Sequence, residues 1–218
     1  MFTEQAEVLT VEVEEEALST QNPLIALARS GPVTFRSEMT REQFHQFVLD
    51  NSEVKIERDP FGFITIYPPM TLNSGYYEGE AFYILKHWSR KSALGRAFSP
   101  TTSFDLPDGS THKADGAWIS MEKLNRLSAA ERDSIALIVP DFVMEVRSKT
   151  DRTVKLKEKM TDTWMANGVR LAWLIDPIKQ KTWVYRADGS TEELDGLEHV
   201  LSGEDVLPGF EFNLAELT

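Results

Sequence analysis

Cysteine is absent from the 218-residue sequence, and this absence excludes disulfide bonds, thiolate metal ligands and a cysteine nucleophile. Long apolar runs are also missing, since none approaches the roughly 20 residues that a helix needs to cross a bilayer. A signal peptide would begin with basic residues and continue with apolar ones, whereas the first 20 residues contain no basic residue. A reducing compartment is compatible with these features. We therefore expect a cytoplasmic protein that does not bind a membrane.

Basic residues are the minority among the charged ones, with 23 lysines and arginines against 35 aspartates and glutamates and a net charge of −12. DNA-binding domains are often basic, so the overall charge argues against a nucleic-acid partner. The charge is uneven, however, because the first 20 residues hold six glutamates and account for half of the excess. A basic strip lies further along the chain and consists of Arg147, Lys149, Arg152, Lys155, Lys157 and Lys159. This strip is either a solvated helix face or a contact for phosphate groups.

Two regions of different composition divide the chain. We interpret residues 1–37 as an acidic arm followed by a linker, in which Pro23, Gly31 and Pro32 interrupt regular structure. The apolar content of 41% suffices for one globular domain with a core, and we place that domain at residues 38–218. The arm either imitates nucleic acid and occludes the basic strip, or only adds solubility or contacts a partner chain.

Apolar periodicity and turn residues predict an α/β domain. Helices are expected after Thr40, over 76–91, over 121–127 and over 153–166, and a hairpin over 54–67. Further strands are expected over 97–106, 114–119, 142–146, 169–175 and 181–185. The order of strand, helix and strand between 142 and 175 implies a crossover connection and parallel pairing. The predicted fold is therefore a mixed β-sheet with helices on its faces.

Two carboxylates conflict with this apolar pattern. Glu145 lies inside the buried strand 142–146, where a charge is costly unless it is paired or binds a metal. Asp115 stands at the entry of another apolar strand, and Gly116 beside it would let a ligand approach closely. Such conflicts tend to mark functional sites. The alternatives are a structural ion pair for Glu145 and an ordinary turn aspartate for Asp115.

Lysines follow these carboxylates on the helix after the Glu145 strand. Lys155 and Lys159 are four residues apart and share a helix face, so a lysine near Glu145 is geometrically plausible, although a solvated helix lysine is the alternative. Carboxylate oxygens suit Mg²⁺, which takes only one or two protein carboxylates and keeps several waters. A lysine beside such a metal can orient or deprotonate its water. Two carboxylates and a lysine are thus a set that phosphodiester hydrolysis can use.

Several stretches of the sequence resemble one known family. They are DLPDG at 105–109, PDFVMEVRS at 140–148, LKEKM at 156–160, NGVRLAWLIDP at 167–177 and LSGEDVLPGF at 201–210. Together they closely resemble the Uma-two family of bacterial proteins, which are described as restriction endonucleases. The resemblance extends from Glu38 to the C-terminus and leaves the acidic arm outside.

The resemblance implies a PD-(D/E)XK, restriction-endonuclease-like fold and a divalent-metal-dependent nuclease that uses Mg²⁺ or Mn²⁺. It implies Asp115, Glu145 and Glu80 as metal ligands and Lys159 as the catalytic lysine in place of the usual motif lysine. Two positions depart from the motif. Ala114 replaces the expected proline, and Arg147 replaces the motif lysine. Because arginine stays protonated, it cannot act as a general base, although it can clamp a phosphate.

The expected substrate is a nucleic acid, namely DNA, and the expected assembly is a homodimer. Arg147, Lys155 and Lys157 are the candidate substrate-binding residues. The alternative is a non-catalytic relative, in which the nuclease fold serves as a binding or interaction module. The acidic balance and the arginine at 147 favour this alternative, which predicts no metal binding.

Overall fold

A six-stranded sheet forms the centre of the molecule in the computed structural model, which describes residues 22–217. The predicted acidic arm over 1–20 lies outside the described residues. In spatial order the strands are β11 (Thr191–Asp195), β10 (Lys181–Arg186), β9 (Leu171–Asp176), β8 (Phe142–Val146), β7 (Gly116–Ser120) and β4 (Gly95–Phe98). Only β8 and β9 pair in parallel, and the other pairs are antiparallel. The predicted mixed sheet and its parallel pair are confirmed.

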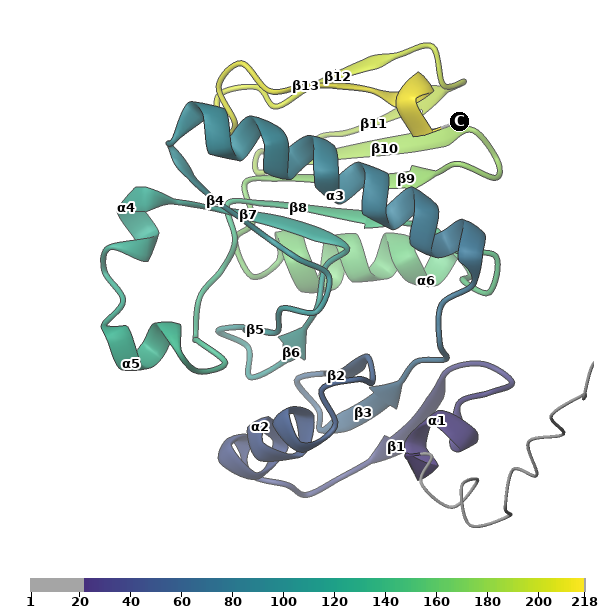
Figure 1. Cartoon of the computed structure of the whole chain (residues 1–218), viewed down its shortest axis with the longest axis vertical. Coiled ribbons are helices and arrows are strands. Elements are labelled where there is room, and N and C mark those ends of the chain that lie inside the picture. Colours follow the sequence, from purple (N-terminus) through teal and green to yellow (C-terminus); the bar gives the residue numbers. More distant parts are fainter. Residues whose placement is uncertain (1–21, 218) are drawn as a thin grey trace, which may run out of the picture.

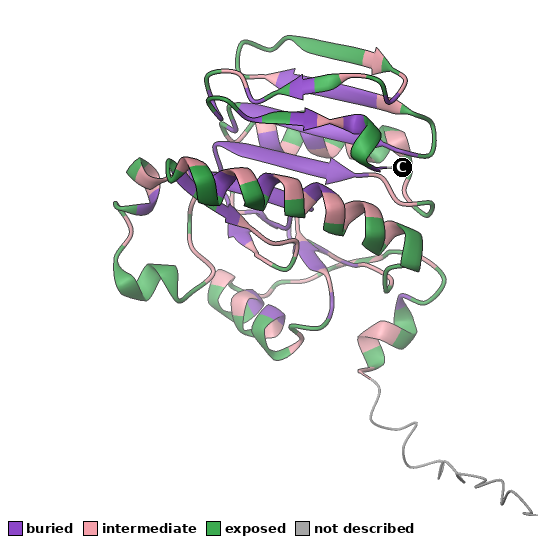
Figure 2. Cartoon of the chain, turned by 45° about the horizontal axis from the view of Figure 1, so that its top comes forward, coloured by how far each residue is buried: buried purple, intermediate pink, exposed green. Residues whose placement is uncertain are grey.

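Helices cover both faces of this sheet (Figure 1). One face packs against α3 (Leu72–Ser92), and the other against α6 (Thr153–Glu158) and the π-helix η2 (Lys159–Met165) that continues it. Side chains along a strand alternate between the faces, so neighbouring residues of β8 enter different cores. Met144 joins the core under α3, and Val143 joins the core that contains Trp164 of η2. The buried strands and striped helices of Figure 2 show this layering.

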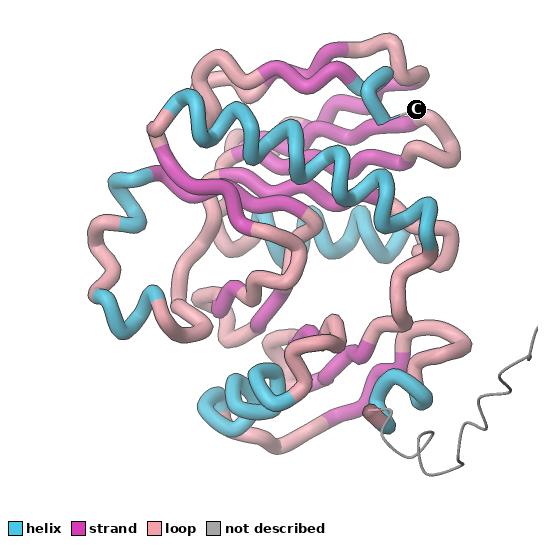
Figure 3. Tube along the Cα trace, viewed as in Figure 1, coloured by secondary structure: helices cyan, strands magenta, loops and turns pink. Residues whose placement is uncertain are grey.

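A second, five-stranded sheet lies beside the first. Its order is β1 (Val33–Arg36), β3 (Phe63–Ile66), β2 (Ile56–Arg58), β6 (Thr111–His112) and β5 (Phe104–Asp105). Together with α1 (Pro23–Leu27) and α2 (Arg41–Asp50), the first three strands form what we call the N-terminal lobe, residues 22–69 (Figure 3). This lobe has its own apolar core, which includes Phe44, Ile56 and Ile64.

The remaining elements complete the periphery. They are α4 (Met121–Leu124), α5 (Ala129–Arg132), β12 (Val200–Ser202), β13 (Glu211–Asn213) and the 3₁₀ helix η3 (Leu214–Leu217). The pair β12 and β13 covers the α3 side of the sheet, where Phe210 stacks on Trp173 with ring centroids 5.6 Å apart. Within the described part of the chain, no helix is both long and apolar enough to cross a membrane.

Most predicted elements are present, with shifted boundaries. Helix α2 begins after Thr40, whose side chain forms a capping box with Gln43, as the sequence indicates. Helix α3 begins four residues earlier than expected because the Thr71 side chain caps the backbone N–H of Ser74. The predicted linker over 21–37 contains α1 and β1, and β1 pairs with β3 throughout its length. A domain boundary at residue 38 would therefore separate two paired strands.

Candidate active site

Asp115 and Glu145 occupy adjacent positions on neighbouring antiparallel strands. Gly116 of β7 pairs with Met144 of β8, and the next residue outward on each strand is one of the two carboxylates. Both residues are almost fully buried, with 5% and 2% of their surfaces exposed. The fold thus brings together two acidic residues that β7, α4 and α5 separate in the sequence.

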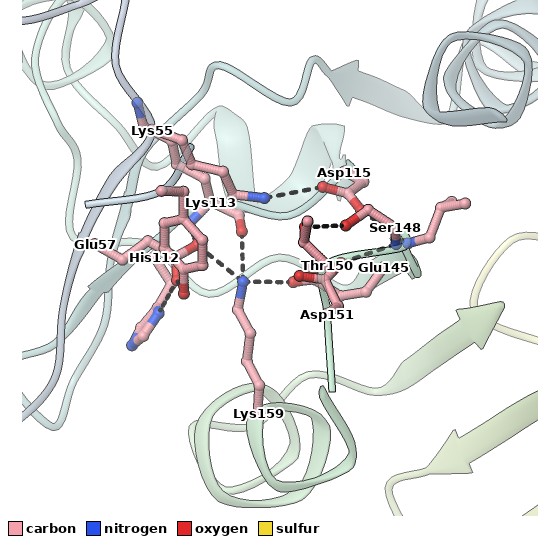
Figure 4. A network of polar contacts seen from close by, with 12 residues as sticks. Lys55, Glu57, His112, Lys113, Asp115, Glu145, Ser148, Thr150, Asp151 and Lys159 are labelled. Atoms are coloured by element: carbon pink, nitrogen blue, oxygen red, sulfur yellow. Dashed lines mark hydrogen bonds and ion pairs between the residues drawn. The ribbon is translucent and has the colours of Figure 1, made fainter. Parts of the chain in front are cut away.

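Asp115 is held at both oxygens. Its Oδ2 accepts the backbone N–H of Val146 at 2.8 Å, and its Oδ1 accepts the ammonium of Lys55 at 3.0 Å. Lys55 comes from the N-terminal lobe and points into the site (Figure 4). Glu78 of α3 also hydrogen-bonds to Asp115.

Glu145 is held by the helix on the other side of the strand. Its Oε1 accepts the Lys159 ammonium at 2.8 Å and the indole N–H of Trp164 at 2.9 Å. Lys159 also donates to Glu57 at 2.8 Å and to the carbonyl of Lys113 at 2.9 Å. Three acceptors thus surround the three hydrogens of this ammonium, and the structure brings Lys159 to the carboxylate as predicted.

Glu57 is a buried member of the site that sequence reasoning missed. Its Oε1 accepts Lys159 and the backbone N–H of Lys113, and its Oε2 accepts the Tyr67 hydroxyl at 2.9 Å. Nδ1 of His112 lies 3.2 Å from the same Oε2. Glu57 occupies the polar side of an alternating hairpin, which ordinarily faces solvent. Here that side faces the site, so only the tertiary arrangement reveals its role.

The acidic residue that α3 contributes is Glu78 rather than Glu80. Glu78 lines the cavity at the site and hydrogen-bonds to Asp115, whereas Glu80 is not among the lining residues. Residues two apart on an α-helix are rotated by about 200° and point to nearly opposite sides, so only one of them can face the cavity. The α3 glutamate that lines the cavity therefore lies two residues before the expected one.

The predicted substrate-binding residues do not line the cavity. Arg147 donates to the buried Asp176 at 3.2 Å and to the carbonyl of Asp151, so it ties the loop after β8 to β9. Lys155 pairs with Glu158 at 2.7 Å on an exposed helix face. Lys157 lies over the Trp183 ring, 4.0 Å from its centroid. Of the basic strip, Lys149 and Lys159 line the cavity.

A cavity of about 480 Å³ opens between the N-terminal lobe and the ends of β7 and β8. Its charged lining includes Lys55, Glu78, Lys113, Asp115, Glu145 and Lys159. Gly116 serves a different purpose from the one expected. A Cβ there would lie 2.3 Å from Cε of Met144, so the space beside it is filled by the core and not by a ligand.

Burial and mutual repulsion disfavour the charged forms of Glu145 and Glu78 and so raise the pKa values of both carboxyl groups. Burial raises the pKa of Glu145 to about 7, because the attraction of Lys159 only partly offsets it and the charge of Asp115 adds to it. Burial, together with the neighbouring Asp115, raises the pKa of Glu78 to about 8. Burial opposes the charge of Lys159, but Glu145 and Glu57 outweigh it and raise its pKa.

Comparison with known proteins identifies the family of this chain. The sequence profile of the Uma2 (Uma-two) family, described as "Putative restriction endonuclease", matches residues 41–215. The chain belongs to the Uma2 family. No curated protein sequence matches it. Among solved structures, a "putative nuclease belonging to DUF820" from Anabaena variabilis ATCC 29413 superimposes with a TM-score of 0.67 at 18% identity, over 82% of this chain and 97% of that chain. At this identity the likeness shows the shared fold.

The donor set of this Uma2-family protein fits a hard divalent cation. Asp115, Glu145 and Glu78 present carboxylate oxygens to one cavity, and these are the ligands that Mg²⁺ and Mn²⁺ prefer. Within residues 22–217, no three histidine, cysteine or acidic side chains are already arranged around one cation position. Mg²⁺ requires only one or two protein carboxylates and completes its shell with water. The Asp115 and Glu145 pair is therefore sufficient.

Proposed function

We propose that this Uma2-family protein is a divalent-metal-dependent endonuclease that hydrolyses phosphodiester bonds in DNA, with Mg²⁺ or Mn²⁺ as its cofactor. The observation that carries the proposal is the placement of the buried Asp115 and Glu145 and of Lys159 at one cavity. A buried group of this composition adds little to stability compared with an apolar one. A role in catalysis explains the presence of this group better than a contribution to stability does.

Each residue has a distinct task in this reaction. Asp115 and Glu145 would hold the metal, and Glu78 would add a third oxygen once it loses its proton. A bound divalent cation lowers the pKa of a coordinated water and neutralises phosphate charge. Lys159, held on three sides, would stabilise through its positive charge the negative charge that develops on the phosphate. Trp164 and Glu57 keep Glu145 and Lys159 in place.

Calorimetric titration with Mg²⁺ and Mn²⁺, with and without a short DNA duplex, tests the proposal together with cleavage of plasmid and single-stranded DNA. Asp115→Asn should abolish metal binding and lower cleavage by at least about 100-fold. Asp141→Asn is a matched control, because Asp141 also accepts a backbone N–H, from Ser120, and a lysine, Lys123, but lies outside the cavity. Wild-type protein that binds no metal even with DNA would identify a non-catalytic module instead.

A further inference from the structure

Lys55 is the less firmly held of the two cations that contact the acidic pair. Lys159 donates to three acceptors, whereas Asp115 is the one hydrogen-bond acceptor found for the Lys55 ammonium among the described residues. The Lys55 side chain is 28% exposed and Lys159 only 11%. Lys55 can therefore leave its partner at a lower cost than Lys159 can.

The Asp115 oxygen that Lys55 contacts is also an oxygen that a metal ion would need. Val146 occupies Oδ2 of Asp115 through its backbone N–H, so Oδ1, which Lys55 contacts at 3.0 Å, is the oxygen that has no backbone partner. An ammonium and a divalent cation repel each other strongly at this range. Both cannot remain on the same oxygen.

Lys55 is one of several lysines that line the cavity. Its ammonium lies 5.5 Å from the centroid of the Tyr67 ring, and Lys113, Lys149 and Lys159 line the same cavity. A phosphate held at the acidic pair would therefore lie in a cavity that also contains ammonium groups.

We propose that Lys55 exchanges partners during the reaction cycle, holding Asp115 in the metal-free protein and binding a non-bridging phosphate oxygen of the nucleic acid once a divalent cation takes its place. Lys55 is thus a substrate-binding residue contributed by the N-terminal lobe, and in the resting protein it competes with the metal. The inference rests on the proposed nuclease function and adds to it the group that recognises the phosphate.

Lys55→Met tests the exchange because it keeps the apolar stem and removes the charge. Metal affinity without DNA, measured by calorimetry, should increase about tenfold because the competitor is gone. DNA affinity with Ca²⁺ present, measured by fluorescence anisotropy, should decrease about tenfold. The slope of log K for DNA binding against log salt should become shallower, by the amount that corresponds to about one phosphate contact. Gel electrophoresis confirms that the DNA stays intact.

Lys123→Met provides the matched control. Lys123 pairs with the buried Asp141 at 2.9 Å and has nearly the same exposure as Lys55, 31% against 28%, but it does not line the cavity. It should leave both affinities unchanged. If Lys55→Met does not fold, Lys55→Gln replaces it, since an amide still donates to Asp115 without charge, and the same two changes are expected.

Opposite changes in metal and DNA affinity would support the exchange. Unchanged or weaker metal binding, or an unchanged salt slope for DNA, would assign Lys55 a purely structural role and overturn the inference while the nuclease proposal stands. A wild-type protein that binds no metal with or without DNA overturns the nuclease proposal itself, and the exchange with it. The two failures are therefore distinguishable.

Discussion

Glu57 makes polar contacts with more residues than does any of the site residues that the sequence predicts. Four groups surround its two oxygens: the Lys159 ammonium, the Lys113 backbone N–H, the Tyr67 hydroxyl and Nδ1 of His112. In Glu57→Gln an amide group replaces one acceptor oxygen and must face a donor. We expect a loss of about 3 kcal/mol in the free energy of unfolding, measured by urea titration.

Glu122→Gln is the control for this change. Glu122 pairs with Arg126 on the surface, and both side chains are more than 70% exposed. An exposed pair contributes about 0.5 kcal/mol at most, so this variant should unfold like the wild type. Equal, small effects in both variants would show that the contacts around Glu57 are readily replaced by water.

The raised pKa values of Glu78 and Glu145 predict how stability depends on pH in the metal-free protein. Between the ordinary glutamate value of 4.5 and about 8, folded Glu78 keeps a proton that the unfolded chain has lost. Folding then takes up a proton, so the free energy of unfolding falls as pH rises through this window. Glu145, with a pKa of about 7, acts in the same direction. Glu57, whose pKa is lowered, acts oppositely and only below its ordinary value.

Urea unfolding in EDTA at several pH values between 5 and 8 measures this dependence. Glu78→Gln should remove most of the decline above pH 7, because Glu145, with a pKa of about 7, is already more than half deprotonated there, whereas Glu78, with a pKa of about 8, still holds most of its proton. The same decline in the variant and the wild type would assign the effect to another group.

At the scale of elements, the π-helix η2 brings two donors to one carboxylate. Residues five apart on an α-helix point about 140° away from each other, whereas i→i+5 bonding brings them toward the same side. The Ala166 backbone N–H bonds in this way to the carbonyl of Thr161. Lys159 and Trp164, which are five apart, therefore both reach Oε1 of Glu145.

Trp164→Phe removes one of these donors and keeps an aromatic ring. Trp173→Phe is its matched control, since both tryptophans are fully buried but the Trp173 indole N–H has no hydrogen-bond partner among the described residues. We expect Trp164→Phe to cost about 2 kcal/mol more than Trp173→Phe in the free energy of unfolding, because it weakens a buried carboxylate's hydrogen bonding. Equal costs would mean that only ring size matters at both positions.

The same elements explain which parts of the site a sequence can predict. Glu145 interrupts an apolar strand and Asp115 enters one, so each conflicts with its own local pattern, and their placement at the site is as expected. The local sequence pattern gives no such signal at Lys55, Glu57 and Glu78. They look like solvent-facing residues of a hairpin and a helix, and only the packing of the N-terminal lobe against the sheet turns them inward. The π-helix escapes prediction for the same reason, since its stabilising contact with Glu145 is tertiary.

At the scale of the whole molecule, polar contacts rather than a shared apolar core join the N-terminal lobe to the six-stranded sheet. The lobe's apolar cluster is separate from the two clusters that flank the sheet. Between β2 and β6, one residue pair, Arg58 with Thr111, continues the ladder. Further links include the contacts of Lys55 and Glu57 in the site, the ion pair of Arg41 with the buried Asp105 at 3.1 Å and the hydrogen bond from the Lys113 ammonium to the Val54 carbonyl. These are links that water, a metal or a phosphate can replace.

The lobe should therefore open more readily than the sheet unfolds, and hydrogen exchange followed by mass spectrometry measures this difference. Amides of residues 33–66 should exchange faster than those of β8, β9 and β10. Arg41→Ala should accelerate exchange in the lobe without changing it in the sheet. Arg170→Ala, which removes a surface pair with Asp205 on the sheet side, should affect neither. Uniform protection across both parts would mean that they unfold together and that substrate enters a site whose walls do not separate. Selective opening would instead make the lobe the part that admits a nucleic-acid strand and carries Lys55 onto it.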